Sequence, residues 1–574
     1  MESTPVGGGR GMEIAEEWRP EQHRTGSRAG PFCPPPENYF LSRGVPVPIR
    51  FPPVSSGSPQ ATMTLHPISI PRFQRLAMPI SLLFYAALLA ATPVTAEVAS
   101  GGIHPGGVFP SGGSALPDTA VLSGQVDQLF QRWHRPDSPG AAVLVMSGGE
   151  VVHARGYGMA NLEHGIPMRP STVLDIASVS KQFGAMAVAL LEAEGKVRLD
   201  DPVRTYLPEL PSWGDEVTLR QLVHHTSGLR DWPGTLMAGG WDFQDIISYE
   251  QILRMAERQE ELNFPPGSEY AYSNTGYNLL AEVVVRVTGE SFRAFSQERI
   301  FRPLGMHRTH VQDDPSEIIR DRADSYAPRP EGGYRRITNN LTALASSSMH
   351  TTVEDLARWI ANFQDPEVGG FQVMERVHER GILTGGDTIA YAFGQIVELH
   401  RGVRRVTHTG SWAGYRSALH RFPDHDFAVV ILANTADMTP AVLAEEITEL
   451  YLGELLEPFP VAAVDSPVTG APSAGDVTGE ADPVWAPSLA ELEEYEAVYR
   501  SRELDSAYEL RMEEGALVAH HFRSGRRIFH PIEPDHFQAV GLGEVRFVRD
   551  GEGRITAFTA NSVRVRNLRF DRIP

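Results

Sequence analysis

Lysine is almost absent from this chain of 574 residues. Among 51 basic side chains, the only lysines are Lys181 and Lys196, and all the others are arginines. Arginine can replace lysine wherever a soluble cation is needed. It cannot do so where a nitrogen must lose its proton, because a guanidinium stays charged in proteins whereas burial and neighbouring charges can tune a lysine amine. The lysines that remain are therefore candidates for chemistry.

An excess of positive charge is also lacking. The formal net charge is −21 and the pI is about 5.4, which argues against a nucleic-acid partner because no basic field is present to neutralise phosphates. Cys33 is the only cysteine, and it lies in a segment that we expect to be absent from the mature protein. A cysteine-free exported protein is compatible with an oxidising compartment but does not prove one.

The first part of the chain has no pattern of a folded domain. Residues 1–62 are rich in Pro, Gly and Arg, and we interpret them as a disordered extension from an upstream start site, with Met63 as the true start. Residues 63–96 combine basic residues, an apolar run over 76–91 and small residues at 94–96, the pattern of a secretory signal peptide. The alternative is a transmembrane anchor, but the run is shorter than about 20 residues and is broken by Pro79.

This reading predicts a periplasmic or secreted protein with no stable membrane anchor after cleavage. Residues 97–118 then form a Gly-rich leader. Strand patterns follow near the start of the ordered chain, separated by Gly148-Gly149, and return after residue 400, with helical patterns between them. The sheet is thus assembled from distant segments around a helical insert, which predicts one α/β (α+β) domain over 119–456. Thr352-Val-Glu-Asp355 predicts a helix that begins with a capping box.

The last part of the chain changes character. Residues 457–486 are rich in Pro, Gly, Ala and Ser and are predicted to form a linker. From Ser488 onward, short strand patterns alternate with turns such as Asp550-Gly551, which predicts a small antiparallel β-sandwich or barrel over 487–574.

Ser178-Val-Ser-Lys181 places one of the two lysines three residues after a serine, at the start of an apolar helical run. Free N–H groups at a helix start favour developing negative charge, so Ser178 is suited to act as a nucleophile. Lys181 lies one turn along on the same face, and the helix is apolar nearly all round, which predicts that the lysine is buried. The alternative is an ordinary surface lysine on an amphipathic helix.

Two further stretches carry groups that a serine nucleophile needs. Tyr272-Ser-Asn274 follows a Pro/Gly turn, and His408-Thr-Gly-Ser411 begins at the end of the strand predicted over 405–409. A hydroxyl nucleophile requires a base, donors for the developing oxyanion and a proton for the leaving group. His224-His225 could suggest a metal, but no H-E-x-x-H pattern is present, and we predict no metal and no cofactor.

Together, Ser-x-x-Lys, Tyr-Ser-Asn and His-Thr-Gly resemble the three motifs of the serine β-lactamase and penicillin-binding protein superfamily, and most of all the class C β-lactamase-like serine hydrolases. The resemblance covers about 119–456. It implies an antiparallel sheet flanked by helices with a helical subdomain, with Ser178 as the acylated nucleophile and Lys181 and Tyr272 as the base pair. Which of the two takes the proton stays open. The C-terminal strands are similar to the small lipocalin-like barrel appended to some of these hydrolases.

The resemblance also implies the substrate-binding groups. Asn274 would position the substrate or Lys181, the stretch of His408, Thr409 and Gly410 would lie beside the site, and the N–H groups of Ser178 and Ser411 would form the oxyanion hole.

Two positions depart from the superfamily pattern. True β-lactamases and most penicillin-binding proteins carry Lys where this chain has His408, whereas His occurs among relatives that act on D-amino-acid peptides and esters. An imidazole is a weaker, pH-dependent anchor for a substrate carboxylate, which argues against efficient β-lactam hydrolysis. Relatives often carry Gly-Gly where this chain reads Ala345-Ser-Ser-Ser348, so we expect a turn of different shape.

We therefore expect an exported serine hydrolase that forms an acyl-enzyme with an amide, a D-amino-acid peptide or an ester, a small-molecule or peptide substrate. The alternatives are a catalytically silent penicillin-binding or sensor domain and a true β-lactamase. The sequence does not indicate an oligomeric state.

Overall fold

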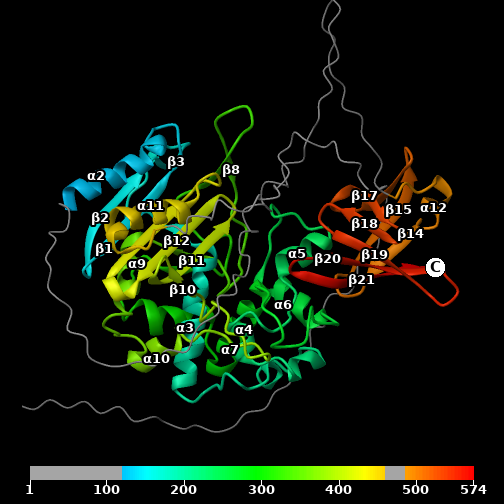
Figure 1. Cartoon of the computed structure of the whole chain (residues 1–574), viewed down its shortest axis with the longest axis horizontal. Coiled ribbons are helices and arrows are strands. Elements are labelled where there is room, and N and C mark those ends of the chain that lie inside the picture. Colours follow the sequence, from blue (N-terminus) through cyan, green and yellow to red (C-terminus); the bar gives the residue numbers. More distant parts are fainter. Residues whose placement is uncertain (1–118, 459–484) are drawn as a thin grey trace, which may run out of the picture. The chain divides into compact units, whose positions relative to one another are not determined.

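The computed structural model describes residues 119–458 and 485–574 (Figure 1). The predictions for 1–62, for the signal peptide at 63–96 and for the leader at 97–118 lie outside these residues, as does most of the predicted linker at 457–486. In the described part of the chain, no helix is both long enough and apolar enough to span a membrane.

A six-stranded sheet forms the centre of the larger part, and every pair of neighbouring strands in it is antiparallel. The first two strands form a hairpin whose turn residues, Gly148 and Gly149, have φ values of 61° and 78°, as a two-residue turn of this kind requires. The sheet joins this early hairpin to strands from after residue 400, as predicted, and also contains a strand over 396–400 that was not predicted. In spatial order, the strands are β10 (Ile396–His400), β11 (Val403–Trp412), β12 (Tyr415–Phe422), β13 (Phe427–Ala433), β1 (Ala141–Ser147) and β2 (Glu150–Tyr157).

The two faces of the sheet bury separate cores, because successive side chains of a strand point to opposite sides. Val143 and Ile431 face a smaller cluster that includes residues of α2 and α11. Leu144 and Val430 face the main cluster, which includes α3, α7 and α9 (Figure 1). The helices are α2 (Thr119–Phe130), α11 (Pro440–Leu452), α3 (Lys181–Ala193), α7 (Asn274–Thr288) and α9 (Val353–Ala361).

The insert between β2 and β10 is mainly helical and carries short strand pairs. Its remaining helices are α4 (Leu219–Val223), α5 (Trp232–Ala238), α6 (Tyr249–Arg258), α8 (Phe292–Ser296) and α10 (Gly370–Arg376). Its short strands are β3 (Met159–Asn161) with β4 (Ile166–Pro167), β5 (Leu174–Asp175) with β9 (Met349–Thr351) and β6 (His310–Val311), and β7 (Ser325–Pro328) with β8 (Tyr334–Ile337).

The C-terminal part is a closed barrel of eight antiparallel strands, preceded by α12 (Leu489–Glu493). Closure leaves no free sheet edge, which decides between the sandwich and the barrel that the sequence left open. The interior is aromatic, with Tyr499, Phe537 and Phe558 among its buried residues. The strands are β14 (Ala497–Ser501), β15 (Ser506–Glu513), β16 (Ala516–His521), β17 (Gly525–Glu533), β18 (His536–Ala539), β19 (Gly543–Arg549), β20 (Ile555–Ser562) and β21 (Val565–Ile573).

The fold class is therefore confirmed: an antiparallel sheet flanked by helices, a helical subdomain and a C-terminal barrel. The capping box predicted for α9 is only half present. The Thr352 side chain accepts a hydrogen bond from the Asp355 N–H at 3.0 Å. The Asp355 carboxylate does not return the bond, because it accepts from the Arg308 N–H and the Thr309 hydroxyl, both at 2.8 Å.

Candidate active site

Ser178 lies in the 3₁₀ turn η3 (Ala177–Ser180), which runs directly into α3. The preceding residue, Ala177, has φ 46°, a left-handed conformation that costs energy for a residue with a side chain. Two contacts hold the turn: the Asp175 carboxylate accepts the Ala177 N–H at 2.7 Å, and the Ser417 hydroxyl donates to the Ile176 carbonyl at 2.8 Å. Ser178 is thereby presented, partly exposed, from an otherwise buried segment.

Lys181 is fully buried, as the apolar helix predicted. Its Nζ lies 2.7 Å from the Asn274 Oδ1, 2.8 Å from the Ser346 carbonyl oxygen and 3.3 Å from the Ser178 Oγ. The first two atoms can only accept hydrogen bonds, whereas a hydroxyl can also donate one. A neutral amine, with two N–H groups and one lone pair, satisfies all three contacts if the Ser178 hydroxyl donates to it.

The surroundings favour this neutral form. Burial lowers the pKa of the Lys181 amine well below its usual value, Asp231 acts in the opposite direction, and Arg564 adds to the lowering. Among the described residues, no carboxylate forms an ion pair with Lys181. The amine thus lies within hydrogen-bonding distance of Ser178 in surroundings that favour its neutral form.

Tyr272 lies beside both residues. The Lys181 Nζ is 4.8 Å from the centre of the Tyr272 ring. Burial raises the pKa of the Tyr272 phenol well above its usual value, although a hydrogen bond with Ser178 opposes the shift. The phenol is therefore protonated at neutral pH, so in the resting site it is a proton donor.

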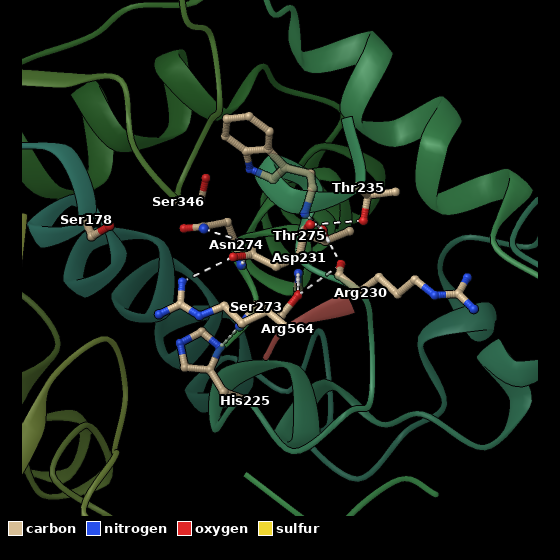
Figure 2. Close-up of polar contacts among 12 residues, drawn as sticks. Ser178, His225, Arg230, Asp231, Thr235, Ser273, Asn274, Thr275, Ser346 and Arg564 are labelled. Atoms are coloured by element: carbon tan, nitrogen blue, oxygen red, sulfur yellow. Dashed lines mark hydrogen bonds and ion pairs between the residues drawn. The ribbon is translucent and has the colours of Figure 1, made fainter. Parts of the chain in front are cut away.

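Asn274 is the first residue of α7 and is held by a residue that the sequence did not single out. The Asp231 Oδ1 accepts from both the backbone N–H and the side-chain Nδ2 of Asn274, at 2.8 and 2.9 Å (Figure 2). Since the Nδ2 is engaged by the carboxylate, the amide oxygen faces Lys181. Thr275 fixes the segment around Asp231, because its hydroxyl donates to the Arg230 carbonyl at 2.7 Å and accepts from the Trp232 N–H at 2.9 Å.

His408 is buried and both of its ring nitrogens have partners. The Nδ1–H donates to the Thr409 carbonyl at 2.7 Å, and the Nε2 lies 3.1 Å from the Tyr391 hydroxyl, which donates to it. Burial is the main cause that lowers the pKa of His408 to about 3, and a protonated Lys181 would lower it further. The imidazole is therefore neutral and forms part of the wall of the site.

The strand that carries His408 approaches the nucleophile closely. A Cβ on Gly410 would lie 2.3 Å from the Ile176 carbonyl oxygen, so β11 and the Ser178 turn can be this close only because the residue is glycine. The pairing of β11 with β10 ends at Thr407, and no described strand pairs with that side of β11 beyond this point. Thr409 and Ser411 are exposed on this stretch, which leaves backbone groups available to a substrate.

The two other histidines are structural. His224 contacts the carbonyls of Arg220 and Glu379 at 2.9 and 3.1 Å. His225 accepts from the Ser273 N–H at 3.1 Å, and its ring centre lies 4.2 Å from that of Tyr272. Within 119–458 and 485–574, no group of three or more His, Cys, Asp or Glu side chains is arranged to hold a metal ion.

Three contributors to the site were missed in the sequence. Asp231 precedes Trp-Pro and is at the N-cap of α5, so the local pattern suggests a helix start and not a catalytic neighbour. Ser346 contributes a backbone carbonyl, which no side-chain pattern reveals. It lies in the turn where relatives often carry glycines, and Ala345 and Ser348 there have φ 60° and 62°. Arg564 comes from the barrel, 333 residues beyond its partner Asp231.

Comparisons with known proteins agree with this geometry. The Beta-lactamase family model matches residues 126–452. Penicillin-binding protein 4* of Bacillus subtilis (strain 168) is 30% identical over 334 residues, which are 54% of this chain and 71% of that protein. A D-aminopeptidase of Gluconobacter oxydans (strain 621H) is 28% identical over 343 residues, 59% of this chain and 63% of that protein.

A solved structure shares the fold beyond the family match. The octameric penicillin-binding protein homologue from Pyrococcus abyssi superimposes with a TM-score of 0.52 at 22% identity, covering 79% of this chain and 100% of that one. The family match itself spans more than half of this chain and includes every site residue from Ser178 to Ser411. The chain therefore belongs to the Beta-lactamase family, within the superfamily of serine β-lactamases and penicillin-binding proteins.

Proposed function

We propose that the protein is an exported serine hydrolase that forms an acyl-enzyme at Ser178. The observation that carries the proposal is the buried amine of Lys181, whose Nζ lies 3.3 Å from the Ser178 Oγ. Such an arrangement supplies the base that a serine hydroxyl needs. Export rests on the signal-peptide pattern at 63–96, and N-terminal sequencing of the mature protein tests it, since a mature chain that begins before residue 63 would contradict export by this signal.

Lys181 is the general base in this scheme, and Tyr272 is the proton carrier. The Ser178 hydroxyl passes its proton to the Lys181 Nζ as Oγ bonds to the substrate carbonyl carbon. The N–H groups of Ser178 and Ser411 stabilise the oxyanion. As the bond to the leaving group breaks, Tyr272 gives its proton to the departing nitrogen or oxygen and recovers one from Lys181. Water then attacks the carbonyl carbon of the ester as one of its protons passes to Lys181. The bond between that carbon and the Ser178 Oγ breaks, Lys181 returns the proton to Oγ, and the carboxylic acid and free Ser178 are released.

The proposed substrate class rests on the missing cation at position 408 of β11. His408 is neutral and bonded at both ring nitrogens, so it supplies no charge to bind the carboxylate of a β-lactam. Relatives named D-aminopeptidase support amides and peptides with D-configured residues. We therefore propose a D-configured amide or peptide, or a small ester, as the substrate, in an enzyme of the class C-like or DD-peptidase type. A catalytically silent binding domain and a true β-lactamase are the alternatives.

Covalent labelling tests the nucleophile. The mature protein is expected to take up a fluorescent fluorophosphonate at Ser178, whereas Ser178→Ala loses the label and loses esterase activity on the order of 10³-fold or more. Ser180→Ala is the matched control, since Ser180 is buried two residues away and its hydroxyl has no partner; this variant should label as the parent does. Label retained in Ser178→Ala would exclude this nucleophile, and an unlabelled parent would favour the silent binding domain.

The pH dependence tests the base. Burial lowers the pKa of Lys181, so kcat/KM for an uncharged ester should rise as pH passes through a Lys181 pKa well below 10.5 and then stay level. Burial raises the pKa of Tyr272, so kcat/KM should fall only above pH 10, where the phenol loses its proton. His408 should add no step near pH 6.5, since its pKa is about 3. Lys181→Arg should lower kcat/KM by about 10²- to 10⁴-fold at every pH. A rise with its midpoint at pH 10 or above would mean that Lys181 is an ordinary charged lysine.

A substrate panel tests the class. We expect measurable kcat/KM for p-nitrophenyl acetate and for a D-alanyl amide, and a lower value for the L-alanyl amide. The value for nitrocefin should be at least about 100-fold lower, because the neutral His408 supplies no charge to bind its carboxylate. Nitrocefin as the best substrate of the panel would instead identify a true β-lactamase.

A further inference from the structure

The barrel contacts the segment of the hydrolase that holds Asn274. The Arg564 carbonyl, just before β21, accepts hydrogen bonds from the Asp231 N–H at 3.1 Å and from the Asn263 Nδ2 at 3.0 Å. The Arg230 Nε donates to the Arg566 carbonyl at 2.9 Å, and the Arg230 guanidinium forms a buried ion pair with Glu503. These backbone and buried contacts fix β21 against residues 230–231.

This docking brings one barrel side chain to the catalytic groups. The Arg564 Nη1 lies 3.2 Å from the Asp231 Oδ2 (Figure 2). The guanidinium carbon of Arg564 lies 4.7 Å from the centre of the Tyr272 ring. The other carboxylate oxygen of Asp231 holds Asn274. Contacts therefore run without a break from Arg564 through Asp231 and Asn274 to Lys181, and from there to Ser178.

We propose that Arg564 is a positioning residue of the hydrolase site: it neutralises Asp231 and fixes the carboxylate in the orientation in which Asn274 holds Lys181 beside Ser178. The C-terminal barrel thereby supplies a part of the active site. The proposal rests on the proposed function, because it assigns Arg564 a role in the proton transfer from Ser178.

The charges around Lys181 explain why an arginine is needed there. The ionisable groups that face it are Asp231, Arg564, His225, His408 and Tyr272. The histidines are neutral because burial lowers their pKa values, and Tyr272 is protonated. That leaves Asp231, which favours the ammonium form of Lys181, and Arg564, which opposes it. Without Arg564, the buried carboxylate would favour a protonated lysine that cannot act as a base.

The polar contacts of Lys181 lead to the same conclusion from geometry. Its other neighbours are uncharged: Asn274 on α7, the Ser346 carbonyl, Ser178 on η3, and the Tyr277 ring, whose centre lies 5.7 Å away. Asp231 is 4% exposed and Arg564 27% exposed at their side chains, so the pair is shielded from solvent on the carboxylate side. Water therefore screens the negative charge of Asp231 only weakly, and the positive charge of Arg564 is what reduces its effect on Lys181.

The experiment uses the full mature chain and an uncharged ester, p-nitrophenyl acetate, over pH 5 to 10. In Arg564→Gln, the rise of kcat/KM with pH on the acid side of the profile (the acid limb) should shift to higher pH by about 0.5 unit or more. At pH 7, kcat should fall about 10-fold, while KM should change less than about 2-fold. Activity should recover at alkaline pH, which a misfolded variant would not do. Arg564→Lys should restore part of the loss, and Arg564→Gln combined with Asp231→Asn should return the limb toward its parental position.

Arg566→Gln is the matched control, because Arg566 is also on the hydrolase-facing edge of the barrel but pairs with the exposed Glu269; its pH profile should match the parent. An equal loss at every pH with the limb unmoved would overturn the proposal in favour of a purely structural contact. A loss seen only as a raised KM for carboxylate-bearing substrates would overturn it in favour of substrate binding. Fluorophosphonate labelling of the parent at Ser178 tests the proposed function separately. If the parent is labelled, either of these two results counts against the role of Arg564 alone; if the parent is not labelled, the proposed function itself fails.

Discussion

The site depends on one costly interaction, the burial of the Lys181 amine. A charged ammonium at this depth would require a close carboxylate, and the groups that touch the amine are an amide oxygen, a carbonyl oxygen and a hydroxyl. The neutral amine removes most of the desolvation cost and leaves one lone pair for the Ser178 proton. The fold provides the contacts from three distant segments, η3 with α3, the start of α7, and the turn at Ser346.

That arrangement also accounts for the strained turn that carries Ser178. The left-handed Ala177 places Ser178 at the beginning of α3 and one turn from Lys181. The turn is held by Asp175 and Ser417, and β11 can lie against it because Gly410 has no side chain. The conformational energy of Ala177 is offset by the hydrogen bonds that Asp175 and Ser417 make to this turn.

The sequence carried much of this information, and its gaps have a physical cause. The spacing of hydrophobic residues and the turn residues predicted the strands at both ends of the domain, the buried helix after Ser178 and the C-terminal barrel. These elements could be predicted because each leaves its pattern within a short stretch of sequence. The scarcity of lysine drew attention to Lys181. Asp231 and Arg564 were not found, because their importance comes from a contact between segments 333 residues apart. Ser346 acts through its backbone, and the neutral state of His408 depends on Tyr391 and on burial, neither of which a motif can show.

The central claim is that Lys181 is neutral in the resting protein, and the rarity of lysine makes it directly measurable. Labelling all lysines with ¹³C at Cε and ¹⁵N at Nζ gives NMR signals for only Lys181 and Lys196 in the mature chain. Lys196 is half-exposed and paired with Glu194, so it serves as an internal reference. If Lys181 is neutral in the resting protein, the signal lost in Lys181→Arg titrates well below the usual lysine pKa of about 10.4. Titration of that signal at or above the usual pKa would contradict a neutral Lys181.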